Sequence, residues 1–421
     1  AAKSSRPFSA WIGPSAPWRP EVQLPDPVEL GDLLEPFSRR GIDLGLDRLH
    51  QALAAGGHPE QRFPAVQVAG TNGKGSICTA LGAILQAAGL KAGLYRSPHL
   101  ISWCERIAIG DQWIAGQQLR SLLQRWQPTG QQHQLTPFEL LTAVAMDHFA
   151  ATQVDLAVLE VGLGGRLDAT TCHPNRPVLG IANIGLDHRE HLGSTLEAIA
   201  AEKAGIFHTG AVAFSAPQQD SVAQVLEQQA KQRGCQLHWV EPLTADVPLG
   251  LAGSWQRSNG AVALAMAQEL ARQGWTISDQ AMAQGLAQAQ WSGRLQRRQW
   301  RGQPVLIDGA HNPPAAEGLR RELNQLAPGQ PRHWLLGIQR HKDGPAIVRA
   351  LMAPGDRAWM VPIEGCRSWQ ASELNIPGVH DSPSAEQALE QLWPAACEPV
   401  IAGSLYLLGQ LWPTLEPPAE G

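Results

Sequence analysis

Residues 68–76 combine glycines, a lysine and a hydroxyl where an apolar strand turns into a helix. The segment reads Val-Ala-Gly-Thr-Asn-Gly-Lys-Gly-Ser. In this setting backbone N–H groups and the helix dipole bind phosphate, with Lys74 directed at the β- and γ-phosphates and Ser76 at Mg²⁺. The standard Walker A spacing is not met, because Val68 replaces the first glycine and Gly75 displaces the hydroxyl. An ordinary glycine-rich turn is the alternative, but three glycines and one of only six lysines in the chain favour phosphate binding.

Two further polar clusters also follow apolar segments. Glu160 ends one segment and precedes Gly-Leu-Gly-Gly-Arg, and Asp187 and His188 follow another. Because the carboxyl ends of parallel strands form the ligand-binding edge of a sheet, we expect these side chains on the same edge as Ser76. Glu160 is either a Mg²⁺ ligand or a solvated strand-end carboxylate. His188 is distinguished from an ordinary histidine only by its position, and Lys203 also suits a helix C-terminus.

The elements that must position these residues alternate between strand and helix. Apolar residues recur at helical spacing from Ile77 to Ala88, directly after the glycine-rich segment. The short apolar segments of the first series are 65–69, 92–95, 156–161, 178–184 and 211–214, and those of a second series are 305–307, 335–338, 358–361 and 400–402. Such alternation is typical of parallel sheets with helices on both faces.

These patterns predict an α/β protein with two folded domains. The proline-rich residues 1–27 are expected to form an irregular arm. Residues 28–298 are expected to form an ATP-binding domain with a parallel sheet like that of P-loop ATPases. Residues 299–421 are expected to form a smaller Rossmann-like C-terminal domain, with the boundary near 296–302, after an arginine-rich stretch.

Composition excludes several classes of protein. The 421 residues are 43% apolar and 17% charged, which is sufficient for packed cores and excludes a disordered or fibrous chain. A net charge of −5 gives no electrostatic case for binding nucleic acid or an anionic membrane. No apolar run approaches the ~20 residues that span a bilayer. The six cysteines are scattered, so neither a disulfide framework nor a zinc site is expected, and we expect a cytoplasmic protein.

Taken in order, these motifs resemble those of the folylpolyglutamate synthase/dihydrofolate synthase family, the folate branch of the Mur ligase superfamily. The resemblance extends over residues 40–410, and so many motifs in order are specific. The segments that carry it are Gly45–Arg48, Gly70–Ser76, Ser97–Leu100 with Glu105–Ile107, Thr136–Glu139, Glu160–Thr170, Asp187-His188, Glu202–Ile206, Asn259, Gly293-Arg294, Asp308–Pro313, Lys342-Asp343 and Gly403–Tyr406. Thr171 departs from the family, which usually has Asn there, as do Arg340 and His341, where an acidic residue is common.

The resemblance implies a role for each candidate residue. Residues expected to bind ATP are Gly70, Thr71, Asn72, Gly73, Lys74, Gly75, Ser76, Asn259, Arg294 and Asp308. Residues expected to hold Mg²⁺ are Ser97, Glu160 and His188, and a carbamylated Lys203 would ligate a second ion. Residues expected on the substrate side are Thr136, Phe138, Glu139 and His311. Lys74, His188 and Lys203 are the expected catalytic residues. Carbamylation requires a neutral amine, hence a depressed pKa for Lys203.

The resemblance also implies the reaction. ATP would phosphorylate a pterin carboxylate, and L-glutamate would attack the resulting acyl phosphate while domain closure excludes water. A bifunctional enzyme would use dihydropteroate and tetrahydrofolate, act as a monomer, and need neither nucleic acid nor a membrane. An enzyme with only one of these activities is the nearest alternative. A muramyl-peptide ligase and a non-catalytic nucleotide-binding module are further alternatives, the first disfavoured by Gly75 and the second by the intact lysines.

Overall fold

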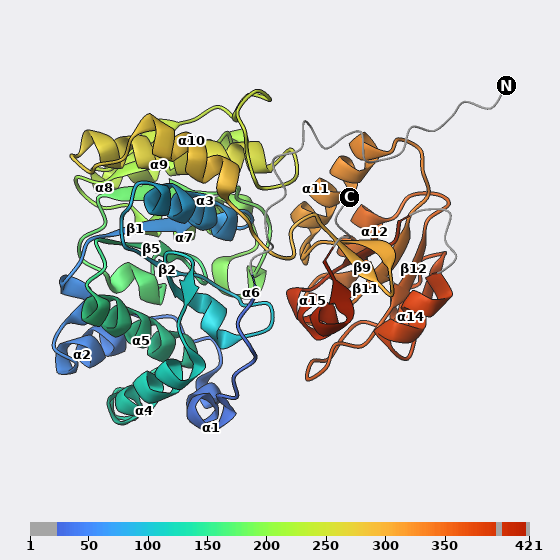
Figure 1. The fold of residues 1–421 in the computed structure, drawn as a ribbon, viewed down its shortest axis with the longest axis horizontal. Coiled ribbons are helices and arrows are strands. Elements are labelled where there is room, and N and C mark those ends of the chain that lie inside the picture. Colours follow the sequence, from blue (N-terminus) through green and yellow to red (C-terminus); the bar gives the residue numbers. More distant parts are fainter. Residues whose placement is uncertain (1–22, 393–397, 418–421) are drawn as a thin grey trace. The chain divides into compact units, whose positions relative to one another are not determined.

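The computed structural model describes residues 23–392 and 398–417, and these form two compact units (Figure 1). The larger unit comprises Leu24–Leu251 and Trp255–Trp291, and the smaller unit comprises Ala252–Ser254 and the described residues from Ser292 onward. The expected N-terminal arm, residues 1–27, lies outside the described residues as far as residue 22. In the described part of the chain, no helix is both long and apolar enough to cross a membrane.

The larger unit is built on an eight-stranded sheet with the order β4-β3-β2-β5-β1-β6-β7-β8. Its parallel strands are β1 (Ala65–Ala69), β2 (Ala92–Tyr95), β5 (Leu156–Glu160), β6 (Val178–Ile181), β7 (Val212–Ser215) and β8 (Gln236–Trp239). Two antiparallel strands, β3 (Ile107–Ile109) and β4 (Gln112–Trp113), complete one side. Val68 pairs with both Glu160 and Gly180, so the carboxyl ends of β5, β1 and β6 lie side by side.

Helices cover both faces of this sheet (Figure 1). On one face, α3 (Lys74–Ala87), α9 (Gln256–Arg272) and α10 (Asp279–Gln288) bury apolar residues against Val66 and Val68. The expected apolar face of the first helix, including Ile77, Leu81, Ile84 and Leu85, is fully buried there. Because side chains alternate along a strand, Ala65 and Ala69 of β1 face the opposite side.

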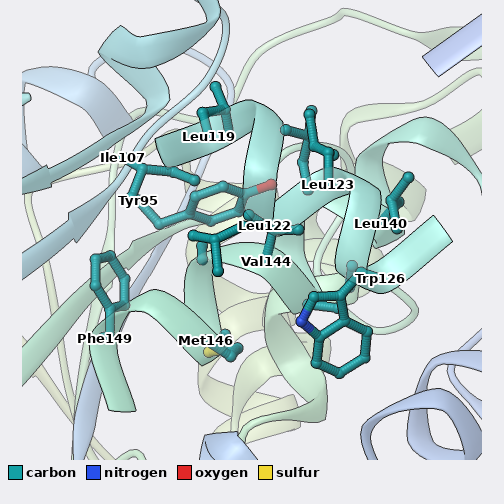
Figure 2. Packing of buried hydrophobic residues seen from close by; sticks show 14 of the residues in the cluster. Tyr95, Ile107, Leu119, Leu122, Leu123, Trp126, Leu140, Val144, Met146 and Phe149 are labelled. Carbon is teal, nitrogen blue, oxygen red and sulfur yellow. The ribbon is translucent and has the colours of Figure 1, made fainter. Parts of the chain in front are cut away.

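The opposite face carries two groups of helices. One group consists of α1 (Gly31–Leu34), α2 (Asp47–Ala55), α4 (Gly116–Gln132) and α5 (Pro137–Thr152), whose core around Tyr95, Trp126 and Phe149 is shown in Figure 2. The other group consists of α6 (Arg189–Leu192), α7 (Leu196–Lys203) and α8 (Asp220–Arg233), packed around Ile181, Ile199 and Leu226. Helix α7 ends at Lys203, shortly after the residues that it buries in this core.

The smaller unit has a seven-stranded sheet with the order β13-β12-β11-β14-β10-β9-β15. Its parallel strands are β10 (Gln303–Ile307), β11 (His333–Leu336), β12 (Arg357–Met360), β13 (Val379–Asp381) and β14 (Val400–Ala402). Strands β9 (Gln296–Trp300) and β15 (Leu415–Glu416) are antiparallel. The helices are α11 (Pro313–Leu326), α12 (Gly344–Leu351), α13 (Ala371–Leu374), α14 (Ala385–Leu392) and α15 (Leu405–Leu411).

The predicted fold class, two α/β units with mostly parallel sheets, is confirmed. All the predicted parallel strands are present, and only their ends differ. The segment predicted at 178–184 stops at Ile181, because the chain then turns across the glycine-rich loop, where Asn72 pairs with Asn183. Strands that the sequence did not predict are mostly short, antiparallel or at a sheet edge, where a partly exposed strand lacks a continuous apolar run.

Candidate active site

The glycine-rich loop leaves β1 at Ala69 and enters α3 at Lys74. Gly70 and Gly73 both have positive φ values, 146° and 100°, which side-chain-bearing residues rarely adopt. The loop is also tightly enclosed: a Cβ on Gly73 would lie 2.3 Å from Asn259 Oδ1 of α9. The structure therefore brings Asn259, predicted to contact the nucleotide, directly against the loop predicted to bind its phosphates.

Two lysines from distant parts of the sequence bind one carbonyl group of this loop. Lys74 Nζ donates to Gly70 O at 3.1 Å, and Lys203 Nζ donates to the same oxygen at 2.8 Å. Lys203 is buried, and desolvation, together with the charge of Lys74, lowers its pKa to about 7, although Asp187 and Asp168 oppose the shift. A substantial fraction of Lys203 is therefore the neutral amine near neutral pH, whereas an exposed lysine is almost fully protonated.

Two of the predicted metal ligands meet at the ends of neighbouring strands. Glu160 is the last residue of β5, and Ser97 follows the end of β2. The Ser97 N–H donates to Glu160 Oε2 at 3.1 Å, and the Glu160 side chain is buried. This pair presents a carboxylate and a hydroxyl, both oxygen donors, at the carboxyl edge of the sheet.

The turn after Glu160 is held by a residue that was not predicted as functional. The buried Asp168 carboxylate accepts hydrogen bonds from the N–H groups of Gly162 at 3.0 Å and Leu163 at 2.9 Å, and from Thr170. Burial raises the pKa of Asp168, and these hydrogen bonds oppose the increase. In the sequence, Asp168 was notable only because it lies within the family-like segment Glu160–Thr170. That position could not show which backbone groups its carboxylate binds.

The same turn packs against the end of α7. A Cβ on Gly165 would lie 2.7 Å from the carbonyl oxygen of Lys203, so only glycine permits this approach. Arg166 reinforces the contact through an ion pair with Glu202, at 2.9 Å. Thr171, where the family usually has Asn, donates to Gly165 O at 2.7 Å. The turn therefore connects the strand end that carries Glu160 with the helix end that carries Lys203.

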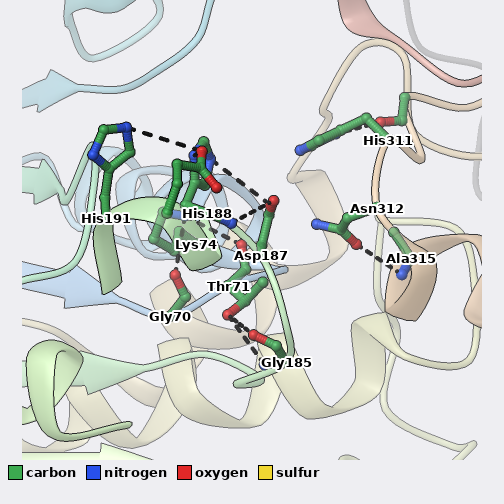
Figure 3. Close-up of polar contacts among 12 residues, drawn as sticks. Gly70, Thr71, Lys74, Gly185, Asp187, His188, His191, His311, Asn312 and Ala315 are labelled. Carbon is green, nitrogen blue, oxygen red and sulfur yellow. Dashed lines mark hydrogen bonds and ion pairs between the residues drawn. The ribbon is translucent and has the colours of Figure 1, made fainter. Parts of the chain in front are cut away.

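The predicted Asp187 and His188 lie on the loop after β6, as expected (Figure 3). Thr71 Oγ1 donates to Gly185 O at 3.0 Å and accepts from Gly185 N at 3.1 Å, which ties this loop to the glycine-rich loop. His188 has a φ of 49°, in the left-handed region that few non-glycine residues occupy. Its Nε2 lies 3.9 Å from Asp187 Oδ2, and its N–H donates to Asp187 Oδ1.

Three of the four residues predicted on the substrate side lie at the start of α5, and two of them form its cap. Thr136 Oγ1 accepts from the Glu139 N–H, while Glu139 Oε2 accepts from the Thr136 N–H at 2.7 Å and from Arg48 Nε at 2.8 Å. These contacts are a capping box with an added ion pair, and they stabilise the helix terminus. Phe138 instead reaches the turn after Glu160, where a Cβ on Gly162 would lie 2.5 Å from its ring.

The loop between Ser97 and Arg106, part of the resembling motifs, is ordered by two side chains. Glu105 accepts hydrogen bonds from three backbone N–H groups, those of residues 100–102. His99 Nδ1 accepts from Arg106 Nε at 2.9 Å. Burial and the Arg106 charge lower the pKa of His99 to about 3, so this imidazole is neutral and acts as an acceptor.

In the smaller unit, Arg294, Asp308 and His311 gather where β10 ends. The buried Asp308 carboxylate accepts from Leu295 N and from Ala310 N, each at 2.8 Å. Burial raises the pKa of Asp308, whereas the Arg294 charge lowers it. His311 Nδ1 lies 2.9 Å from Gly309 O, and Asn312 caps α11, as Figure 3 shows. Asp308 therefore shapes the backbone around it.

Across residues 23–392 and 398–417, no cluster of three His, Cys, Asp or Glu side chains could hold a metal ion. The predicted donors are a hydroxyl and a carboxylate, carried by Ser97 and Glu160, which are in contact, and an imidazole on the loop after β6. Zinc sites are built from cysteine, histidine and carboxylate ligands, and a serine hydroxyl is not among them, so this set does not suit zinc. It is compatible with Mg²⁺, which keeps several water molecules and uses few protein ligands.

Comparison with known proteins matches both units. Residues 68–241 match the Mur ligase middle domain, and residues 292–367 match the C-terminal domain of dihydrofolate synthetase. The dihydrofolate synthetase of Saccharomyces cerevisiae is 31% identical over 415 residues, covering 88% of this chain and 97% of the relative. The dihydrofolate synthase/folylpolyglutamate synthase of Escherichia coli is 32% identical over 381 residues, covering 86% and 87%.

A solved structure agrees over nearly the whole chain. The bifunctional folylpolyglutamate synthase/dihydrofolate synthase of Yersinia pestis, complexed with AMPPNP and Mn ion, has a TM-score of 0.81 and 29% identity. It covers 94% of this chain and 99% of its own. The fold and the two family matches define an ATP-dependent ligase of the Mur ligase superfamily. The chain belongs to the folylpolyglutamate synthase/dihydrofolate synthase family, and the resemblance inferred from its motifs is confirmed.

Proposed function

We propose that this chain is a bifunctional ligase that joins L-glutamate to dihydropteroate and to tetrahydrofolate, with ATP converted to ADP and phosphate. The observation that carries the proposal is the shared Gly70 carbonyl, which holds Lys74 and Lys203 together at a phosphate loop beside Glu160. This arrangement serves a reaction that must neutralise transferring phosphate and activate a carboxylate. The folate-type C-terminal match favours pterin substrates over muramyl peptides.

ATP would bind with its phosphates on Gly70–Ser76. Lys74 is already within the loop, and its ammonium would neutralise the charge that develops as the γ-phosphate moves to the substrate carboxylate. Asn259 packs on Gly73 and is positioned to contact the nucleotide from α9. Arg294 and Asp308 would contact the nucleotide from the smaller unit, where Asp308 already accepts two backbone N–H groups.

Mg²⁺ is the metal that these donors fit. Ser97 and Glu160 would supply a hydroxyl and a carboxylate, His188 would supply an imidazole, and phosphate oxygens and water would complete the octahedron. When bound, the metal stabilises charge on the transferred phosphate. We propose two ions, because a lysine carbamate would add an anionic oxygen ligand on the Lys203 side of the loop.

Carbamylation of Lys203 needs the neutral amine that burial favours. The Nζ lone pair would attack CO₂, forming an N–C bond and releasing one proton, so that an ammonium site becomes a carbamate anion. Incubation with carbon-13 bicarbonate followed by carbon-13 NMR should then give a carbamate resonance. The resonance should be missing from Lys203→Ala and retained in Lys231→Ala, which removes an exposed lysine of α8. Equal signals in all three proteins would contradict the assignment.

After acyl phosphate formation, the amine of L-glutamate attacks the acyl carbon, phosphate leaves, and an amide bond results. Water must be excluded, because it would hydrolyse the acyl phosphate. Phe138 packs on the turn after Glu160, where it would shield the reacting carboxylate from solvent. We assign Thr136 and Glu139 to the same substrate region through the helix cap that they form, and His311 to the glutamate side.

The decisive experiment measures phosphate release from ATP with Mg²⁺ and L-glutamate, with dihydropteroate in one reaction and tetrahydrofolate in the other. Mass spectrometry of the products should show one added glutamate in each case. Turnover with a single substrate would select the enzyme with one activity. Nucleotide binding with no turnover in either reaction would favour the non-catalytic module. Light scattering and fractionation of cells would test the further proposals of a monomer and of a cytoplasmic location.

A further inference from the structure

Arg96, the residue before Ser97, has an unusual environment. It follows β2, is buried, and places its guanidinium between two indole rings, with its Cζ 5.0 Å from the Trp113 ring centre and 4.7 Å from that of Trp291. Its Nη1 donates to Thr79 Oγ1 at 3.0 Å, whereas its buried Nε has no hydrogen-bond partner. In the described part of the chain, no carboxylate lies within ion-pair distance of Arg96.

A buried cation without a carboxylate partner is costly, so the contacts that stabilise this one matter. Two aromatic rings each provide a cation–π interaction with the guanidinium, and desolvation strengthens such interactions. Only a planar guanidinium can stack on both rings at once, because a lysine ammonium is a compact charge without a plane. Trp113, Trp291 and Thr79 therefore contact the Arg96 guanidinium directly, while the charges of Glu160 and Glu105 stabilise it from beyond ion-pair distance.

Arg96 and Trp291 are connected to three parts of the predicted nucleotide site. Thr79 lies on α3 one turn after the phosphate loop, so the Arg96 hydrogen bond reaches the helix that the loop begins. The Trp291 ring lies so close to Gly75 that a Cβ there would come within 2.9 Å of it. Ser97 follows Arg96 directly and donates its N–H to Glu160.

We propose that Arg96 is a positioning residue for the nucleotide site, acting through its stack with Trp113 and Trp291. The stack fixes the first turn of α3 and the backbone of Ser97 relative to each other. The phosphate loop and the metal-side serine therefore keep the spacing that a nucleotide with its metal requires. Arg96 itself touches neither ATP nor the acid substrate. Its role in catalysis rests on the proposed function, whereas its role in nucleotide binding does not.

The test uses equilibrium binding of ATP with Mg²⁺, measured by calorimetry on the full chain, together with steady-state kinetics. Arg96→Lys and Arg96→Met should each weaken ATP binding about tenfold, the effect of losing one desolvated cation–π contact. The KM for L-glutamate should stay within twofold of the wild-type value, because the stack does not reach that substrate. Trp113→Phe, which keeps an aromatic face, should retain most of the affinity that Trp113→Leu loses.

Arg298 offers a matched control. It is also a buried arginine on an indole, 4.3 Å from the ring centre of Trp412, but it belongs to the smaller unit, whereas the phosphate loop belongs to the larger one. Arg298→Lys should lower the melting temperature without changing ATP affinity. If Arg96→Met changes only the melting temperature, as Arg298→Lys does, the positioning role is wrong and the stack is only core packing.

The half-buried Trp113 lies on the two-residue edge strand β4, so Trp113→Leu provides a test if the Arg96 variants fail to fold. Unchanged ATP affinity in Trp113→Leu would overturn the proposal. Weaker affinity in Trp113→Leu that is largely restored in Trp113→Phe would support it, because the aromatic face is what distinguishes these two variants. Wild-type protein that binds ATP but does not ligate glutamate would refute the proposed function and leave this binding test valid.

Discussion

Where its strands end, the larger unit holds a buried lysine and a half-buried lysine against one carbonyl, whereas the smaller unit buries one carboxylate between two N–H groups. The lysine arrangement leaves repelling positive charges close together, a condition that an incoming polyphosphate would relieve. The Asp308 arrangement satisfies its charge within the protein. We infer from this difference that the strand ends of the larger unit suit an anionic ligand. Those of the smaller unit, around Asp308, mainly stabilise the shape of a loop.

The largest expected effect comes from Lys74→Ala. Under the proposed function its ammonium neutralises the transferring phosphate, so kcat should fall about 10²–10³-fold, as when a preorganised electrostatic contact is removed. The melting temperature should not fall, because the variant relieves repulsion with Lys203. Lys231→Ala, an exposed change, is the matched control. If the melting temperature falls together with kcat, Lys74 stabilises the fold. The contrast drawn between the two sheet edges would then be wrong.

Asp308→Asn should instead affect stability. One of its two N–H partners loses its acceptor, because an amide NH₂ cannot accept, and the free energy of unfolding should fall by about 1–3 kcal/mol. Chemical denaturation measures this directly. ATP affinity separates the two roles of Asp308: a large loss in folded protein would mean that this carboxylate also contacts the nucleotide.

Lys203 should make stability depend on pH. Its pKa is about 7 in the folded protein and near 10.5 when unfolded, so between these values the unfolded chain binds the extra proton. Stability should therefore rise as pH increases from 7 toward 10, by up to about 1.4 kcal/mol per unit from this group. Denaturation in CO₂-free, metal-free buffer should show the rise. The Lys203→Met variant should lose this rise in stability. If the variant keeps the wild-type dependence on pH, Lys203 is solvated in the folded protein.

The smallest effect is expected for Thr171→Asn, which restores the residue usual in the family. The threonine hydroxyl donates to Gly165 O and accepts from Gln67 Nε2, and an Asn amide can also donate and accept. Stability should change by less than about 1 kcal/mol, and activity by less than threefold. If activity falls more than threefold while stability is unchanged, the turn is needed to position Glu160, beyond its contribution to the fold.

Much of the site could be predicted because it is local. The glycine-rich loop, the strand that precedes it and the helix that follows are all encoded within residues 65–87. Glu160 and Asp187 were predicted on one edge because each follows an apolar strand, and parallel strands end together. Thr136 and Glu139 were predicted as substrate-side residues only from the family resemblance, and the helix cap that they form shows that recognition of a motif does not reveal what its atoms contact.

The sequence alone thus determined the α/β fold class, the glycine-rich turn between strand and helix, and the family. Only the tertiary structure decided which groups share a partner. Lys203 reaches Gly70 across 133 positions of sequence, and Arg96 meets Trp291 only because a strand end, a helix and a distant segment converge. Such contacts depend on strand order and on how helices pack on the sheet. No local spacing of residues encodes them, because burial and proximity arise only when the whole unit folds.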